Sequence, residues 1–196
     1  MPAMVRTKQF DRHAVLDEAM EVFWERGYHA TSIQDLVDRL GVNRQSLYDT
    51  YGGKDPLFLA ALDRYREIQG LPLRRLLERD GPVLETLREF FHSVVNAMLN
   101  DNAKGCFMVN TVAELAGHDQ AVTQVCSANA RQLEGAFSGL LVRAQQAGEI
   151  SSERSPLQLA RFLLNTMNGL SVTAKATRDR KLLDDVIDVA LAALNR

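Results

Sequence analysis

The sequence predicts an all-α protein of nine or ten helices, and three observations lead to this prediction. Apolar residues recur every three or four positions along most of the chain, which is the spacing of a helix with one buried face. No segment alternates apolar and polar residues with period two, so strands are not expected. Asp, Asn, Ser or Pro stands at the start of many periodic segments, as is typical of helix N-termini.

The first predicted helix runs from Asp11, its N-cap, to Arg26, and Gly27 ends it. Residues 1 to 9 show no periodicity and are expected to form an irregular arm. One face of the helix is apolar and should cover the elements that follow. This face consists of Val15, Ala19, Val22 and Phe23.

Residues 31 to 51 contain two short helical patterns that are broken at Gly41. Ser32 and Asp35 have the spacing of a capping box, which predicts the start of the first helix. Gly41 suits the positive φ angle at the end of that helix, and Asn43 is a good N-cap for the second. This layout is typical of a helix-turn-helix, in which the second helix is presented to the major groove of DNA.

The second of these helices has a buried side and a polar side. Leu47 and Tyr51 lie one turn apart and are expected to anchor it. The remaining positions carry side chains of the kinds that bond bases and phosphates. The residues predicted to project outward are Arg44, Gln45, Ser46, Tyr48 and Asp49.

Five short elements make this region similar to the DNA-binding domain of tetracycline-repressor-type (TetR) regulators. They are Gly27-Tyr28, Thr31-Ser32-Ile33, Gly41-Val42, Ser46-Leu47-Tyr48 and Lys54-Asp55-Pro56-Leu57, within about residues 10 to 60. The resemblance implies that Tyr48 and Lys54 hold phosphates and that Arg44, Gln45 and Ser46 lie near base edges. The full predicted set of DNA-binding residues is Ser32, Asn43, Arg44, Gln45, Ser46, Tyr48, Asp49, Thr50 and Lys54.

Two positions depart from the pattern of the family. Asp49 stands where an aromatic or neutral residue is more usual, and Thr50 where a histidine often sits. An acidic Asp49 is repelled by phosphate, although its carboxylate can accept a hydrogen bond from cytosine. These departures leave the operator sequence open.

The resemblance also implies the function and the organisation of the chain. It implies a homodimeric DNA-binding transcriptional regulator, most simply a repressor released from a palindromic operator by a small effector, with no enzyme activity and no cofactor. Residues 1–54 are then the arm and helix-turn-helix domain, 55–70 a connecting helix, and 71–196 the ligand-binding and dimerisation domain. The connecting helix is the natural lever between effector and DNA.

The charge balance argues weakly against DNA binding. The net charge is −2, and residues 1 to 70 hold nine Lys and Arg against eleven Asp and Glu. Positive charge is needed only where phosphate is contacted, and the local candidates are Arg6, Lys8, Arg12, Arg44 and Lys54. The other interpretation, above all for Arg6 and Lys8, is that these are ordinary solvated charges. An alternative therefore stays open, a helical small-molecule-binding protein that does not bind DNA.

The longest uninterrupted apolar runs have six residues, Leu57 to Leu62 and Val189 to Leu194. A membrane helix needs ~20 such residues, so no membrane partner is expected. We also expect no signal peptide. Two cysteines are too few for a disulfide framework, which favours a reducing, cytoplasmic location.

The rest of the chain is predicted to be helical throughout. Gly52-Gly53 ends the recognition helix, and Asp55 followed by Pro56 is expected to start the connecting helix. The later helices are expected over Pro72 to Arg79, Pro82 to Asn100, Cys106 to Ala116, Asp119 to Ala147, Pro156 to Thr177 and Lys181 to Leu194.

The last two helices are apolar around more than one stripe, whereas a subunit's own core needs only one. The excess predicts a subunit interface, with helices 156–177 and 181–194 of two chains forming a four-helix bundle. The resemblance implies the same arrangement. We place Leu163 and Val186 in the middle of this interface. The alternative is that both helices are internal to one subunit.

Cys106 follows Lys104-Gly105 at the predicted start of a helix, where the helix dipole and a nearby ammonium favour a reactive thiolate. This position suggests a sensor of electrophiles or oxidants. The segment from Cys106 to Thr111 is also similar to family members whose ligand chambers lie against this helix, some of which sense reactive compounds through a cysteine. The other reading is a packed, inert thiol, and Cys126 fits that reading better.

The effector chamber is expected between the helices that start at Pro82, Cys106, Asp119 and Pro156. Its predicted lining favours a small, largely apolar or aromatic effector over a sugar or nucleotide. The predicted ligand-binding residues are Phe91, Val95, Cys106, Phe107, Asn110, Phe137 and Met167.

Glu89 and His92 have the Glu-x-x-His spacing of di-iron helical bundles, which need two such motifs. Only one copy is present, although Glu114 and His118 are further candidate ligands. A di-metal carboxylate enzyme is therefore the alternative from a different class. No nucleophile elbow, phosphate loop, zinc quartet or dinucleotide fingerprint occurs.

Overall fold

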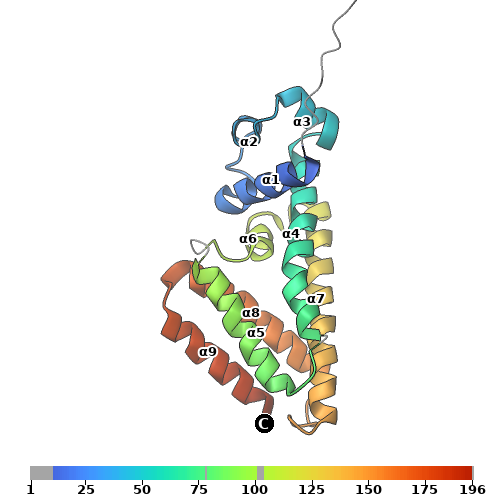
Figure 1. Ribbon diagram of the computed structural model, residues 1–196, viewed down its shortest axis with the longest axis vertical. Coiled ribbons are helices and arrows are strands. Elements are labelled where there is room, and N and C mark those ends of the chain that lie inside the picture. Colours follow the sequence, from blue (N-terminus) through green and yellow to red (C-terminus); the bar gives the residue numbers. More distant parts are fainter. Residues whose placement is uncertain (1–10, 78, 101–103, 196) are drawn as a thin grey trace, which may run out of the picture. The chain divides into compact units, whose positions relative to one another are not determined.

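The computed structural model describes residues 11–77, 79–100 and 104–195, and within these ranges it consists of helices without strands (Figure 1). The all-α prediction is confirmed. The predicted arm, with Arg6 and Lys8, lies outside the described residues. The helices are α1 (Arg12–Arg26), α2 (Ile33–Leu40), α3 (Arg44–Tyr51), α4 (Lys54–Leu77), α5 (Val83–Asn100), α6 (Phe107–Leu115), α7 (Gln120–Gln146), α8 (Pro156–Thr177), α9 (Arg180–Ala192) and a short 3-10 helix, η1 (Ala193–Asn195).

The chain divides into two compact units, Met1–Arg64 and Tyr65–Arg196, and the division falls inside α4. We call them the N-terminal and the C-terminal unit. The N-terminal unit contains α1, α2, α3 and the first part of α4. The C-terminal unit contains the rest of α4 and every later helix.

An aromatic cluster joins α1 to α4 inside the N-terminal unit. The ring centroids of Phe23 and Phe58 are 4.9 Å apart in an edge-on arrangement, and Tyr28 makes a second edge-on contact with Phe58 at the same distance. Leu36 and Leu47 are buried with 0% and 1% of their surface exposed, so α2 and α3 each bury a leucine. These apolar contacts fix the helix-turn-helix on α1 and α4.

The connecting helix differs from the prediction at both ends. Helix α4 begins at Lys54, and the carbonyl of Gly53 accepts a hydrogen bond from Leu57 N–H, so Pro56 is the third helical residue. Proline is tolerated there because N–H groups in the first turn have no partner within the helix. The separate helix predicted over Pro72 to Arg79 was wrong, because Pro72 lies inside α4. Burial of Leu76 in the core of the C-terminal unit offsets the hydrogen bond that the proline removes.

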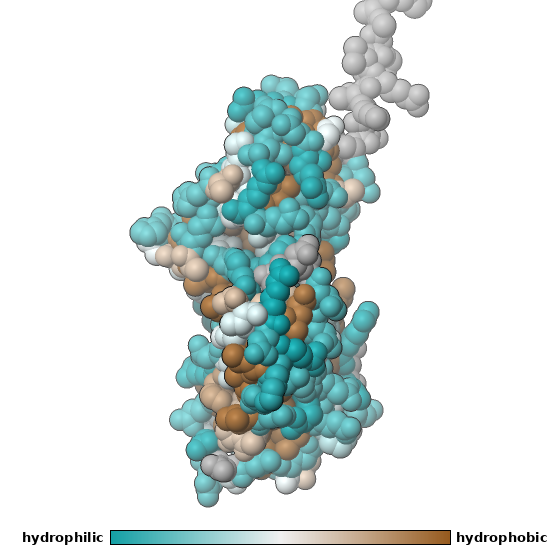
Figure 2. Space-filling view, turned by 90° about the vertical axis from the view of Figure 1, so that its left-hand side faces the viewer, coloured by the Kyte–Doolittle hydropathy of each residue, from teal (hydrophilic) through white to brown (hydrophobic). Residues whose placement is uncertain are grey.

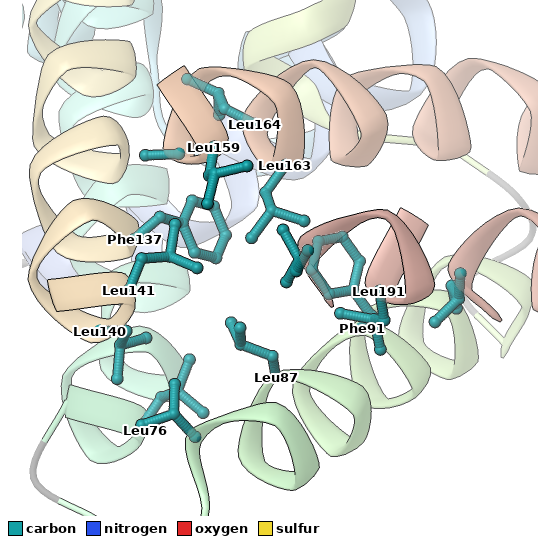
Figure 3. Packing of buried hydrophobic residues seen from close by; sticks show 14 of the residues in the cluster. Leu76, Leu87, Phe91, Phe137, Leu140, Leu141, Leu159, Leu163, Leu164 and Leu191 are labelled. Carbon is teal, nitrogen blue, oxygen red and sulfur yellow. The ribbon is translucent and has the colours of Figure 1, made fainter. Parts of the chain in front are cut away.

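The core of the C-terminal unit lies between α5, α7, α8 and α9 (Figure 3). Phe91 and Phe137 stack with their ring centroids 6.2 Å apart, and both side chains are almost completely buried. Leu159, Leu163 and Leu191 close the cluster from α8 and α9. Within the described ranges, none of the helices has both the length and the apolar character that crossing a membrane demands.

The start of α7 has its predicted cap, and the start of α8 has a cap that was not predicted. Asp119 accepts a hydrogen bond from Val122 N–H at the start of α7, and Ser155 forms a capping box with Gln158 at the start of α8. Helix α6 lies one residue inside its predicted bounds, with Cys106 as N-cap and Ala116 as C-cap. Differences of one or two residues at helix ends are expected, because the terminal turns fray.

Candidate functional site

Ser32 and Asp35 form the predicted capping box at the start of α2. The hydroxyl of Ser32 and then its backbone N–H donate to Asp35, and these bonds lower the pKa of Asp35 from 3.8 to about 2. The arginine Arg26 adds an ion pair to the same carboxylate at 2.5 Å. Because the folded pKa is lowered, the cap stabilises α2 above pH 3.8 and is lost as the pH falls toward 2.

The turn between α2 and α3 also has its predicted geometry. Gly41 has a φ angle of 62°, which is the left-handed conformation that glycine adopts without strain. Asn43 then caps α3, with its side-chain oxygen 2.7 Å from the backbone nitrogen of Ser46. Ser32 and Asn43 thus hold helix starts in place, and a DNA contact by either residue stays a prediction.

Helix α3 has one buried side and one exposed side, as predicted. Leu47 is buried, and the hydroxyl of Tyr51 donates to the carbonyl of Arg12 at 3.0 Å, which ties α3 to α1. Burial raises the pKa of Tyr51, so its hydroxyl stays protonated and keeps donating. The exposed side carries most of the predicted contact residues. Arg44, Gln45, Tyr48 and Asp49 are exposed, and Ser46 and Thr50 are partly buried.

Tyr48 and Lys54 are each held in a defined position. The ring of Tyr48 lies over Gly53, where an added Cβ atom would stand 3.4 Å from Cε1 of the tyrosine. The ammonium of Lys54 lies 4.0 Å from the ring centroid of Tyr28, a cation–π contact. The hydroxyl of Tyr28 in turn donates to Asp55. The hydroxyl of Tyr48 and the ammonium of Lys54, both of which can bind phosphate, are therefore held near the end of α3.

The acidic balance of the N-terminal unit has a structural explanation. Asp17 pairs with Arg64 at 2.6 Å, and Glu18 pairs with Arg39 at 3.0 Å. These carboxylates lie on α1 and are engaged by arginines of α4 and α2. Two acidic side chains of this region are thus neutralised by neighbouring arginines, so the net charge alone does not argue against DNA binding.

The C-terminal helices expose large apolar side chains on one face of the C-terminal unit. We define the α8–α9 face as Leu157, Phe162, Val172, Leu182, Val186 and Val189, which are 38% to 71% exposed. A shallow groove on this face is lined by Phe162, Val186 and Val189, with Asp179, Lys181 and Asp185 among its polar residues. Figure 2 faces the side on which α9 lies and shows apolar residues gathered between polar ones. Such contiguous apolar surface is typical of a subunit interface.

Leu163 does not belong to this face, contrary to the prediction. Its side chain is 0% exposed and packs in the core between α7, α8 and α9. The two apolar stripes of α8 therefore have different roles. The stripe with Leu163 builds the subunit's own core, and the stripe with Phe162 faces outward.

The start of α6 brings three of the predicted ligand-binding residues together. The backbone N–H of Cys106 donates to Ser171 Oγ at 2.7 Å, and the hydroxyl of Tyr65 lies 3.4 Å from Cys106 Sγ. The rings of Tyr65 and Phe107 meet edge-on at 5.7 Å. Gly105 precedes them with a φ angle of 74°, where an added Cβ atom would stand 3.3 Å from Ser171 Oγ.

Asn110 lies one turn further along α6. Its side-chain nitrogen donates to the carbonyl of Lys104 at 2.9 Å, and its oxygen lies 3.4 Å from the ammonium of Lys175. The other four predicted ligand-binding residues are elsewhere. Phe91, Val95 and Phe137 lie inside the core cluster, and Met167 packs against that cluster. The single chamber predicted to contain all seven residues stays a prediction.

Cys126 has the inert environment that its sequence context predicted. It is buried, and its Sγ lies 4.0 Å from Met108 Sδ. Burial raises the pKa of the Cys126 thiol to about 11, so the reactive thiolate is scarce at neutral pH.

Glu89 and His92, the motif of the di-metal alternative, are each engaged by another residue. Arg79 binds Glu89 and lowers the pKa of that carboxyl, while His92 Nδ1 lies 3.0 Å from Asp184 Oδ1. Glu89 and His92 therefore face different partners. Among the residues with described positions, no group of three or more His, Cys, Asp or Glu side chains is arranged to hold a metal ion.

Several residues around Cys106 were missed at the level of sequence. Tyr65 and Ser171 contact Cys106 across separations of 41 and 65 residues, and Lys175 reaches Asn110 across 65. No local spacing signals such contacts. Gln45 and Asp49 were both predicted at the DNA surface, but their hydrogen bond of 2.7 Å was not. Their i and i+4 spacing would have signalled it.

Comparison with known proteins gives consistent matches over nearly the whole chain. A family model described as "Bacterial regulatory proteins, tetR family" matches residues 15–61, and one described as "Tetracyclin repressor-like, C-terminal domain" matches residues 83–190. YezE of Bacillus subtilis strain 168, an uncharacterized HTH-type transcriptional regulator, is 41% identical over 98% of this chain and 100% of its own.

Two further similar proteins have names that state a function. ComR of Escherichia coli K12, an HTH-type transcriptional repressor, is 33% identical over 87% of this chain and 82% of its own. A cysteine mutant of the TetR family regulator CifR, solved in complex with 26-base-pair operator DNA, is 30% identical with a TM-score of 0.84. That alignment covers 96% of this chain and 99% of the CifR chain.

Proposed function

Since the chain belongs to the TetR family of bacterial regulatory proteins, we propose that it is a transcriptional repressor that binds a palindromic operator as a homodimer. The observation that carries the proposal is α3, an eight-residue helix that buries Leu47 and exposes Arg44, Gln45 and Tyr48. A helix presented in this way fits the major groove. Two subunits supply two such helices, one for each half-site, and the α8–α9 face supports their pairing.

The proposed effector is a small, largely apolar or thiol-reactive molecule that acts on the C-terminal unit. Support comes from the apolar Phe107 beside Cys106, and from the hydrogen bonds of Cys106 to Tyr65 and Ser171. An effector releases DNA only if it favours a geometry with the wrong spacing of the two recognition helices. Helix α4 is continuous across the boundary between the units and is the proposed carrier of that change.

A genomic selection tests the proposed function directly. The purified protein is mixed with sheared genomic DNA of its source organism, and the retained fragments are sequenced. We expect one inverted repeat to recur among them, because a symmetric dimer selects a symmetric site. Retention of fragments with no shared motif would contradict a specific operator. Two free cysteines and a DNA partner also lead us to propose a cytoplasmic location.

Substitutions on and beside α3 should separate phosphate contacts from base contacts. We expect Tyr48→Phe and Lys54→Ala to weaken binding to all sequences, and Lys54→Ala to reduce the slope of log affinity against log salt by about 1. Arg44→Ala and Gln45→Ala should cost about 1–3 kcal/mol on the operator and also relax the sequence preference.

Titrations of labelled operator and of scrambled DNA at several salt concentrations measure both effects. Asp38→Asn, an exposed change on α2 outside the predicted contact set, is the matched control. If all four α3-region variants bind the operator like the parent protein, the helix-turn-helix is not the DNA-binding surface.

Alkylation of Cys106 should weaken operator binding. The Cys106 thiolate attacks one carbon of the maleimide double bond and forms an S–C bond. The double bond becomes a single bond, and its other carbon takes up a proton from water. The bulky adduct then stands where the hydroxyl of Tyr65 now contacts Cys106 Sγ. We expect maleimide to lower the operator affinity of the parent protein, and Cys106→Ser to resist it while keeping its DNA affinity.

Cys126→Ser is the control for this experiment, because the buried Cys126 should react slowly and the variant should behave like the parent. Operator affinity before and after treatment, with mass spectrometry of the adduct, gives the answer. Equal sensitivity of Cys106→Ser and the parent would remove Cys106 from the mechanism.

A further inference from the structure

The outer face of α3 carries a hydrogen bond between two residues of the proposed DNA surface. Gln45 Nε2 donates to Asp49 Oδ1 at 2.7 Å, and both side chains are exposed. The two residues lie one turn apart, and Leu47 between them in sequence is buried on the other side of the helix. The bond therefore lies on the side of α3 that is available to DNA.

This bond determines which way the glutamine amide points. An ionised carboxylate only accepts hydrogen bonds, so it holds the NH₂ group of Gln45 and repels the amide oxygen. The reversed amide would place Oε1 against the carboxylate. Gln45 is thus left with Oε1 and one N–H of Nε2 for another partner.

We infer that Asp49 is a positioning residue that orients Gln45 to select adenine, an inference that rests on the proposed function of α3. Adenine presents N6–H as a donor and N7 as an acceptor in the major groove, which match Oε1 and the remaining N–H of Gln45. Guanine presents two acceptors, O6 and N7, so Oε1 would face O6 without a proton between them. The orientation that Asp49 imposes on the Gln45 amide therefore disfavours pairing with guanine.

The charge of Asp49 also has an effect that does not depend on the DNA sequence. A carboxylate on the DNA-facing side of α3 is repelled by phosphates at every site, whatever the sequence. It therefore weakens binding to non-operator DNA, while the oriented Gln45 compensates on the operator. The repulsion lowers the affinity for operator and for other DNA alike, so an increase in the ratio of specific to non-specific affinity comes from the oriented Gln45.

Helix α2 provides a matched pair for the test. Gln34 Nε2 donates to Asp38 Oδ1 at 2.8 Å, also four residues apart and also exposed. This pair has the same chemistry on a helix that is not expected to read bases. Asp38→Asn therefore removes an equal charge from the same unit and tests for general electrostatic effects.

The experiment compares base preferences in a randomised operator library. The base pair read by Gln45 is the one at which Gln45→Ala loses adenine preference. At that base pair we expect Asp49→Asn to lower the preference for adenine over guanine about tenfold, and to raise affinity for non-operator DNA. In the Gln45→Ala background, Asp49→Asn should change the preference no further. Asp38→Asn should leave the preference at its parental value.

Three results would overturn the inference. An unchanged adenine preference in Asp49→Asn, with higher affinity for all DNA, would mean that the residue acts only through its charge. An equal loss of preference with and without Gln45 would mean that Asp49 contacts a base itself. A loss in Asp38→Asn equal to that in Asp49→Asn would mean a general effect of charge.

A measurement on the free protein separates this inference from the proposed function. In the NMR spectrum, the two amide protons of Gln45 should have well-separated shifts that approach each other in Asp49→Asn, while those of Gln34 stay unchanged. Insensitivity of Gln45 to Asp49→Asn would reject the positioning role even if operator binding stands. Failure of the parent protein to bind any DNA site would instead reject the proposed function.

Discussion

Phe162→Glu combined with Val189→Glu should convert the protein to monomers and lower operator affinity about a thousandfold. Both side chains belong to the α8–α9 face and line its groove, with 43% and 71% of their surface exposed in one subunit. Four carboxylates would then be buried in the pair of subunits, which costs far more than the apolar contacts return. A monomer reads one half-site only and loses the gain from simultaneous binding of two.

Analytical ultracentrifugation gives the mass of the variant, and titration with operator gives its affinity. Val142→Glu is the control, because Val142 is a similarly exposed valine of α7 outside the α8–α9 face. Leu163→Glu is unsuitable for this test. Leu163 is fully buried, so a glutamate at this position would unfold the subunit itself. A double variant that sediments as a native dimer would show that the subunits pair elsewhere.

Phe137→Ala should lower the free energy of unfolding by about 3–5 kcal/mol. Phe137 is 0% exposed, stacks on Phe91 and meets Phe90 edge-on, so its removal leaves a cavity as well as lost contacts. Phe137 is also one of the residues predicted to line an effector chamber. A residue that lined an open chamber would have fewer packed neighbours and would cost much less to truncate.

Urea unfolding followed by circular dichroism measures this loss. Phe137→Leu keeps most of the apolar volume and should cost less than about 1.5 kcal/mol, which makes it the matched control. A loss below about 1 kcal/mol for Phe137→Ala would contradict the packed core and favour a chamber at this position.

Local signals predicted the helix-turn-helix well because its geometry is encoded within a few residues. The capping box of Ser32 and Asp35, the left-handed Gly41 and the N-cap Asn43 each satisfy backbone groups nearby in sequence. The same holds for Asp119, the predicted cap of α7. Such residues need no knowledge of the rest of the fold.

Features that depend on tertiary packing were not readable in the same way. Proline is a signal for the start of a helix, but Pro72 lies inside α4, which continues to the buried Leu76 and ends at Leu77. Leu163 and Phe162 are both apolar neighbours on one helix, and periodicity alone does not tell which stripe faces the subunit's own core. Tyr65 and Ser171, which contact Cys106, lie far from it in the sequence and are brought close only by folding.

Ser171 and Val172 are consecutive residues of α8 with opposite surroundings. Ser171 is 2% exposed and accepts the hydrogen bond from Cys106 N–H, whereas Val172 is 57% exposed on the α8–α9 face. Side-chain atoms lie roughly 5 Å from a helix axis, so a roll of α8 by about 20° displaces them by nearly 2 Å. Such a roll would change both the contact of Ser171 with Cys106 and the surface that α8 presents to the second subunit. Because α8 carries both side chains, a rotation of this helix would link the surroundings of the Cys106 thiol to the packing of the partner subunit.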